Sequence, residues 1–202
     1  MAHYTGPRAR INRRLGAVIF ENAGASRAME RKPNPPGMAV RPRKLSTYGE
    51  AMREKQKIKY YYGLGERQLR KLFQKAKHTA GNSGENLLLL CEKRLDSVVR
   101  LAGFAKTRSQ ARQGVAHGHF LVNGRRTDVA SYQVRVGDVI HVKRRANLSD
   151  VYRGNIEMAD GQAADWLTVD NGQQEIIVSR MPTAEDITLP VDVGMVIELL
   201  SR

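Results

Sequence analysis

Residues 94–143 place the tightest limits on the fold of this chain, because they combine a helix start with two tight turns. Thr107 is followed three residues later by Gln110, and this spacing has the form of a capping box at the start of a helix. The apolar run Phe120-Leu-Val leads directly into Asn123-Gly124. Because Asn-Gly tolerates the positive φ angles of a two-residue hairpin, the pattern predicts a strand that enters a tight turn.

A second turn, at Gly137-Asp138, precedes the predicted strand Val139-Ile-His-Val. Upstream, apolar residues repeat at steps of three and four and predict one core helix over residues 86–102. Cys91 lies on the apolar face of that helix, where it behaves as a small apolar side chain. Together these elements predict a small α/β module of two helices against a short sheet, with its core in residues 94–157.

The rest of the chain divides into segments of different character. Residues 1–46 contain frequent Gly and Pro, which predicts a basic extension with one or two short helices. Charged helices are predicted over residues 48–62 and 66–77, and the second has an apolar face opposite a basic face that solvent alone could also cover. Further on we expect a helix over residues 148–157 and then strands at residues 166–169, 176–178 and 195–199.

The charge of the chain points to a polyanion as its partner. With 34 basic and 20 acidic side chains among 202 residues, the net charge is +14, and self-repulsion of this size favours binding to nucleic acid. Residues 1–60 hold 14 basic and 4 acidic side chains, and residues 94–150 hold 11 and 4. Residues 151–202 hold 3 and 9, so we expect this acidic part to face protein or solvent.

Two other protein classes are excluded by composition. No stretch approaches about 18 consecutive apolar residues, so no segment is predicted to span a membrane. Cys91 is the single cysteine, which excludes an internal disulfide framework and fits a reducing compartment. The Arg-rich, acid-poor start could alternatively be a transit peptide.

Enzymatic and metal sites are weakly indicated. Gly63-Leu-Gly65 begins like a nucleotide-binding loop, but it lacks the third Gly and follows a charged helix rather than a strand. His117-Gly-His119 has no nearby cysteine or matching carboxylate to complete a metal site. We therefore predict a protein that is not an enzyme and that uses no cofactor and no metal.

Three phrases in the predicted module resemble the RNA-binding module named after small-subunit ribosomal protein four. They are Arg94-Leu-Asp, Thr107-Arg-Ser-Gln-Ala-Arg and Gly118-His-Phe-Leu-Val-Asn-Gly. Other RNA-binding proteins share this module, so the rest of the chain decides the family. From about residue 4 to residue 202 the chain is similar to the bacterial-type family of this ribosomal protein, through Tyr4-Thr-Gly-Pro, Lys44-Leu-Ser-Thr-Tyr-Gly, Arg53-Glu-Lys-Gln-Lys, Tyr62-Gly63, Trp166-Leu, Leu189-Pro190 and Ser201-Arg202.

The resemblance implies an α+β fold in which the module is inserted into another domain. A helical N-terminal domain would be interrupted by the RNA-binding module and completed by the C-terminal segment. On this basis we expect a basic extension at residues 1–46, a helical first domain made of residues 47–93 and about 174–202, and the module with its following strands at residues 94–173.

The resemblance also implies a structural role in the small ribosomal subunit. Members of the family bind the 5′ domain of 16S-type ribosomal RNA early in assembly, at a junction of several helices. They line the channel through which messenger RNA enters, beside small-subunit proteins three and five, and influence decoding accuracy. We expect the same RNA and protein partners here and no membrane partner. The location would be the cytoplasmic small subunit, although an organellar ribosome also fits.

One departure from the family concerns zinc. Many bacterial members hold a zinc ion through four N-terminal cysteines, whereas residues 23–30 stand where that metal loop would lie and contain none. Structural zinc needs thiolate or imidazole ligands, and His3 is the single candidate before residue 78. The chain is therefore expected to be the cysteine-free, zinc-free form.

The expected binding residues follow from how proteins recognise folded RNA. Because the deep groove of double-stranded RNA hides the bases, a protein at a helical junction contacts phosphates and 2′-hydroxyls with Arg and Lys in fixed geometry. In the first domain we expect contacts from Arg8, Arg10, Arg13, Arg14, Lys44, Arg53, Lys55, Lys57, Arg67, Arg70 and Lys71. In the module we expect one basic surface made of Arg94, Arg108, Arg112, Arg125, Arg126 and Lys143, with hydrogen bonds from Ser109, Gln113, His117 and His119.

Two alternatives use the same module. One is an RNA-modifying enzyme that docks on its substrate through the module, and the other is a messenger-binding repressor. Purification with ribosomal subunits, turnover on free RNA and binding to an operator leader would distinguish the three functions.

Overall fold

The computed structural model describes residues 4–38, 44–159 and 163–201, and the chain divides into two compact units. Unit 1 consists of residues 1–87 and 189–202, and unit 2 consists of residues 88–188. The helices of unit 1 are α1 (Arg8–Leu15), α2 (Ala23–Arg31), α3 (Thr47–Tyr61), α4 (Glu66–Lys77) and α9 (Val193–Ser201). The helix α5 (Ser83–Glu92) contains the boundary between the units.

Local capping explains where the helices of unit 1 begin and end. The Ser46 side chain accepts a hydrogen bond of 3.2 Å from the Gly49 N–H at the start of α3. After α3, Gly63 has a φ of +60°, a conformation that ends the helix and that glycine adopts without strain, so the helix break predicted there is confirmed. Leu69 and Phe73 of α4 are buried, as the apolar periodicity predicts.

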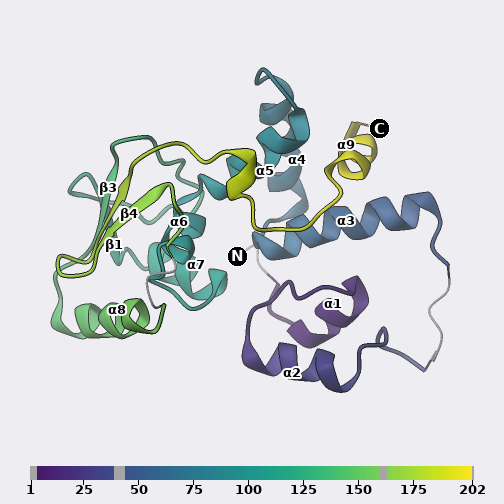
Figure 1. Cartoon of the computed structure of the whole chain (residues 1–202), viewed down its shortest axis with the longest axis horizontal. Coiled ribbons are helices and arrows are strands. Elements are labelled where there is room, and N and C mark those ends of the chain that lie inside the picture. The colour runs from purple at the N-terminus through teal and green to yellow at the C-terminus, as the bar shows by residue number, and fades with distance from the viewer. Residues whose placement is uncertain (1–3, 39–43, 160–162, 202) are drawn as a thin grey trace. The chain divides into compact units, whose positions relative to one another are not determined.

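Packing between residues far apart in sequence closes unit 1. Figure 1 shows the C-terminal helix α9 beside α3, and the two helices are in contact. The Asp192 N–H, just before α9, donates a hydrogen bond of 3.1 Å to Glu54 of α3. This contact confirms that the C-terminal segment completes the helical domain.

The strand predicted at residues 195–199 is wrong, because these residues belong to helix α9. An apolar run of this length has no periodicity that distinguishes a strand from a buried helix. Val196 is fully buried, and Val193 and Ile197 face the start of α5. The helical conformation therefore satisfies the backbone within α9 while its apolar side chains pack on neighbouring helices.

Unit 2 is built on one antiparallel sheet with the strand order β2-β1-β3-β5-β4. Its elements are the strands β1 (Phe120–Val122), β2 (Arg125–Arg126), β3 (Val139–Val142), β4 (Leu167–Asp170) and β5 (Glu175–Val178), and the helices α6 (Leu95–Leu101), α7 (Arg108–Ala116), α8 (Ala146–Ala159) and the 3-10 turn η1 (Ala184–Asp186). The predicted hairpin is confirmed, since Asn123 and Gly124 have φ angles of 50° and 78° between paired residues of β1 and β2.

The core of unit 2 lies between one face of this sheet and the helices. Phe104, Phe120, Ile140 and Trp166 are fully buried in one cluster. Because β5 pairs with β3 through Ile140 and Ile176, residues 175–188 belong to unit 2. The chain returns to unit 1 at residue 189, later than the expected position near 174.

The single core helix predicted over residues 86–102 is instead two helices, α5 and α6. Arg94 between them has extended angles and forms a bridge with Gln133. The Val134 N–H donates to the Lys93 carbonyl, and the Leu95 N–H donates to the Tyr132 carbonyl. This strand-like pairing with a distant segment overrides the helical spacing of the apolar residues.

None of the helices in the described part of the chain is long and apolar enough to cross a membrane.

We predict that Gly84→Ala destabilises the protein by about 1–3 kcal/mol, because a methyl group there would overlap Val193 and lie 2.8 Å from Ile197 of α9. The matched control is Gly154→Ala in α8, where a methyl group meets nothing within 4 Å and should add up to about 1 kcal/mol of helix stability. Urea unfolding of both variants measures the difference. Equal stability of the two variants would show that α5 and α9 are not closely packed.

Candidate nucleic-acid interface

Helix α7 starts as its sequence predicts. The Thr107 hydroxyl accepts a hydrogen bond of 3.2 Å from the Gln110 N–H. The Gln110 side chain reaches back to the Lys106 N–H at 2.9 Å, one residue before the partner expected in a capping box. Ala111 and Val115 are buried in the core, so the opposite face of α7 is directed away from it.

A buried ion-pair cluster, which we call the inner cluster, joins α5, α6 and α7. It consists of Glu92, Arg94, Asp96, Arg108 and Arg112. The Arg94 guanidinium donates to both carboxylate oxygens of Asp96, at 3.0 and 2.8 Å. The side chains of Arg94 and Asp96 are only 2% and 6% exposed, so this bidentate pair is held in a dry environment.

The inner cluster also fixes both basic residues of α7. Arg108 donates to the Ser97 hydroxyl at 2.9 Å and lies 3.4 Å from a carboxylate oxygen of Glu92. Arg112 lies 3.5 Å from Asp96. Burial lowers the pKa of the Arg112 guanidinium, and Asp96 opposes that shift. Three cations thus share two carboxylates, which leaves the cluster one positive charge in excess.

The expectation that Arg94 lies on a basic surface with the other module residues is therefore corrected. Its guanidinium is buried and paired with Asp96, because burying a cation requires a partner that compensates for lost hydration. Arg108 and Arg112 lie at the edge of the cluster, with side chains that are 13% and 21% exposed. Ser109 beside them is half-buried, whereas Gln113 is exposed.

A second group of polar side chains, which we call the Gly118 group, surrounds the turn after α7. It consists of His117, His119, Arg126, Lys143 and Arg145. The two histidine rings lie 5.7 Å apart, and the Lys143 N–H donates to the His119 carbonyl at 2.7 Å. A side chain at Gly118 would overlap the Arg126 guanidinium, so glycine there lets the guanidinium lie against the backbone.

The protonation state of His119 follows from its neighbours. Its pKa is lowered by burial first, and also by the positive charges of His117 and Arg145. The Tyr152 hydroxyl lies 2.9 Å from Nδ1 of His119, and burial raises the pKa of Tyr152 to about 12. The Tyr152 hydroxyl keeps its proton and donates a hydrogen bond to Nδ1 of neutral His119, and this tautomer presents Nε2–H as a neutral hydrogen-bond donor.

In unit 1 the exposed cations lie mainly on α4. Arg67, Arg70 and Lys71 are exposed there, and Arg53 of α3 is half-buried. Lys55 does not lie on the surface as expected, because its side chain is 9% exposed and its amine lies 2.7 Å from Glu66. Lys57 is paired with Glu54. The Lys55 pair therefore joins α3 to α4, whereas the Lys57 pair lies within α3, and neither lysine is part of an open basic face.

The basic residues of the N-terminal extension are held in different ways. The Arg8 guanidinium lies 5.6 Å from the centre of the Phe20 ring, a cation–π geometry. Arg13 donates to the Asn34 carbonyl at 2.9 Å. Arg10, Arg14 and Lys44 are exposed. Arg125 of β2 in unit 2 is also exposed, next to Arg126.

Comparison with known proteins decides the family. Residues 3–92 match the family described as Ribosomal protein S4/S9 N-terminal domain, and residues 93–140 match the S4 domain. The chain is 55% identical over 202 residues to small ribosomal subunit protein uS4 of Rhodopirellula baltica, with all of both chains covered. The chain belongs to the uS4 family of small ribosomal subunit proteins.

Two further uS4 proteins show how far the similarity extends. The protein of Persephonella marina is 41% identical over 207 residues and is covered completely, as is this chain. The protein of Treponema pallidum is 42% identical over 198 residues, which cover 96% of this chain and 97% of that one. As members of the uS4 family are structural proteins rather than enzymes, the alternative of an RNA-modifying enzyme is set aside.

The single cysteine of this uS4 chain is unsuited to binding a metal. Cys91 is completely buried, and burial raises the pKa of its thiol to about 12. Within the described ranges, no three His, Cys, Asp or Glu side chains come together as a metal site. His3, the one early residue considered as a ligand, lies outside the described residues.

Some exposed cations were missed by the sequence analysis. Arg27, Arg31 and Lys32 lie on or just after α2, and Arg144 and Arg145 lie between β3 and α8. For Arg31-Lys32 and Arg144-Arg145 the adjacent pair was the available signal, since such a pair places at least one cation away from a buried face, whereas Arg27 had no such signal. All five are exposed and belong among the candidate RNA contacts.

We predict that Asp96→Asn destabilises unit 2 by about 3–5 kcal/mol, because it leaves the buried Arg94 guanidinium without its anion. Asp150→Asn, which changes an exposed carboxylate of α8, should alter stability by less than about 0.5 kcal/mol. Chemical unfolding followed by circular dichroism compares the two. Similar stabilities would mean that the inner cluster contributes no net stability.

We predict that the free energy of unfolding falls as the pH drops below 6.5, because of the titration of His119. Its pKa is lowered in the folded protein, so the unfolded chain binds the proton more readily than the folded one between the two pKa values. Stability is therefore complete above pH 6.5 and declines as the pH falls toward the lowered pKa. The free energy of unfolding, measured against pH, should decline less in His119→Asn. The Asn side chain can still accept a hydrogen bond from the Tyr152 hydroxyl. A folded-state NMR titration with a His119 pKa at or above 6.5 would contradict this.

Proposed function

We propose that the chain binds the 5′ domain of the small-subunit ribosomal RNA, at a junction of several helices, as a primary assembly protein. The observation that carries the proposal is that both units expose cations in groups. Unit 1 exposes Arg67, Arg70 and Lys71 along α4, and unit 2 exposes Arg126 and Arg145 of the Gly118 group. Acidic side chains are scarce in both groups, so their positive charge is available to phosphates.

The spacing on α4 suits a phosphate backbone. Arg67, Lys71 and Lys75 are four residues apart, so they follow one another along a single face of the helix. The buried Leu69, Phe73 and Ala76 fix the opposite face in the core. Packing on one side directs all three cations to the other, where they can contact successive phosphates.

The inner cluster supports recognition of RNA shape. Glu92 and Asp96 hold Arg108 and Arg112 in place, and the two side chains remain 13% and 21% exposed at the surface of the module. A guanidinium that is already positioned loses less conformational entropy when it meets a phosphate. Within the Gly118 group, neutral His119 would add a hydrogen-bond donor for a phosphate or a 2′-hydroxyl.

The acidic part of the chain suits protein partners. Asp165 and Asp170 near β4 and Glu185 in η1 are exposed, and the RNA would repel them. We propose that this region faces small-subunit proteins three and five, beside the channel through which messenger RNA enters. A role in decoding accuracy would follow from that position.

The test is competitive binding of the full chain to the isolated 5′ domain, against an unrelated structured RNA of equal length at physiological salt. We expect strong preference for the 5′ domain and an affinity that falls steeply as salt rises, because phosphate contacts release counterions. Equal binding to both RNAs would contradict the proposed role. Tighter binding to the leader of its own messenger than to the 5′ domain would favour a primary function as a repressor.

We predict that Arg125→Gln combined with Arg126→Gln weakens binding to the 5′ domain by about tenfold. The slope of log affinity against log salt concentration should also decrease by the contribution of about one to two phosphate contacts. Both residues are exposed on β2, so folding should be unchanged. The matched control is Arg135→Gln with Arg153→Gln, which removes the same charge from exposed positions outside both groups. An equal loss in the control would mean that only net charge matters.

A further inference from the structure

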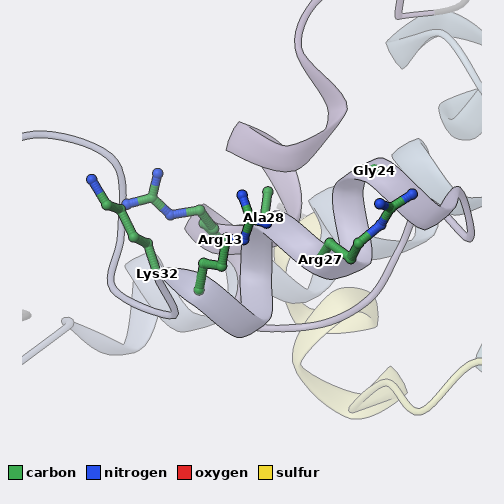
Figure 2. Close-up of a pocket in the computed structure, with 6 residues that line it drawn as sticks. Arg13, Gly24, Arg27, Ala28 and Lys32 are labelled. Atoms are coloured by element: carbon green, nitrogen blue, oxygen red, sulfur yellow. The ribbon is translucent and has the colours of Figure 1, made fainter.

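A pocket of about 460 Å³ lies between α1 and α2 in unit 1, apart from the residues on which the proposed function rests most directly. Four of its six lining residues are cationic: Arg13, Arg27, Arg31 and Lys32. The other two are Gly24 and Ala28. Figure 2 shows Arg13 and Lys32 toward one end of this pocket and Arg27 toward the other, with Ala28 between them.

The sequence of α2 explains why the face of this helix that lines the pocket carries both open space and positive charge. Gly24, Arg27, Ala28 and Arg31 are spaced by three and four residues, so they share one face of the helix. The smallest side chains alternate with the largest cations on that face, which leaves space between the two guanidinium groups. A methyl group built on Gly24 meets nothing within 4 Å, so the space at this point is open.

Two of the cations are oriented by the backbone. Arg13 donates from Nε to the Asn34 carbonyl at 2.9 Å, and Arg27 donates from Nε to the Ala23 carbonyl at 3.4 Å. Both bonds use Nε, so the terminal amino groups of each guanidinium extend beyond the anchored atom. Such a terminal pair of N–H groups fits two oxygens of one tetrahedral phosphate.

Four cations around one hollow repel one another, and an anion relieves that repulsion. A cation or an apolar ligand would leave this charge uncompensated, so the pocket favours a strongly anionic group. The N-terminal end of α2, where Gly24 lies, adds a partial positive charge from the helix dipole. Phosphate matches both the charge and the planar fork of arginine better than a carboxylate does, because it offers more acceptor oxygens.

We propose that the α1–α2 pocket is a phosphate-binding site that holds backbone phosphates of the RNA. This inference rests on the proposed function for its source of phosphate. It assigns a contact to Arg27, Arg31 and Lys32, and it gives α2 a function in binding besides its packing against α1 through the buried Ala25. A free polyphosphate would satisfy the same chemistry, so the experiment separates the two sources.

The experiment uses the full chain and two kinds of variant. Arg27→Gln with Arg31→Gln removes charge from the pocket and keeps its shape. Gly24→Leu keeps all four charges and fills the hollow, at a position where the structure leaves room for a side chain. Gly24→Ala controls for the change in helix propensity, and Arg135→Gln with Arg153→Gln controls for net charge. Circular dichroism establishes that each variant is folded.

We expect both the charge variant and Gly24→Leu to weaken binding to the 5′ domain by about tenfold or more, with changes below about threefold in the two controls. The charge variant should also make the salt dependence shallower by about one to two phosphates. If Gly24→Leu binds as tightly as the unaltered chain, the pocket does not hold a phosphate and the proposal is overturned, whether or not the charge variant binds weakly.

Titration with inorganic pyrophosphate separates this proposal from the proposed function. Pyrophosphate that binds the unaltered chain, competes with the RNA and is lost in Gly24→Leu supports the pocket as the site of RNA phosphates. If the unaltered chain shows no preference for the 5′ domain but binds pyrophosphate in the pocket, the proposed function fails and the RNA source is overturned in favour of a free polyphosphate. Selective RNA binding that no pocket variant changes overturns the pocket alone.

Discussion

The bidentate pair between Arg94 and Asp96 is the interaction on which the RNA-binding module depends. Arg94 lies between α5 and α6 and forms a bridge with Gln133, and its side chain is buried in the protein interior. Only a carboxylate with matching geometry can offset the hydration that this cation loses. Asp96 supplies it from the first turn of α6 and also contacts Arg112 of α7. One carboxylate thereby joins α6 to α7 and to the segment that precedes α6.

This dependence divides the basic residues of the module into two kinds. The arginines of the inner cluster are held by Glu92 and Asp96, so their side chains have less conformational freedom and a more defined position. Those of the Gly118 group lie around a glycine turn and are more open to solvent. A surface that combines both kinds can attract RNA at long range through its open cations and discriminate shape through its fixed ones.

Much of the fold follows from local sequence signals, and the errors share one cause. The hairpin at Asn123-Gly124 and the helix start at Thr107 depend on neighbouring residues, so sequence predicts them correctly. The break at Arg94 and the helical state of residues 195–199 depend on segments far away in the chain. The burial of Arg94 and Lys55 was missed for the same reason, because their carboxylate partners become visible only when helices pack together.

Side-chain bonds to the backbone hold part of the N-terminal extension together. Asn12 is completely buried, and its side chain bonds to the backbone of Ile19 and Phe20, which closes the loop after α1. This local bonding holds α1 but does nothing for the repulsion among the cations between α1 and α2. An anion bound there would favour the folded arrangement, since a ligand that binds only the folded state stabilises it. Binding of phosphate and folding of the extension are therefore thermodynamically linked, so each favours the other.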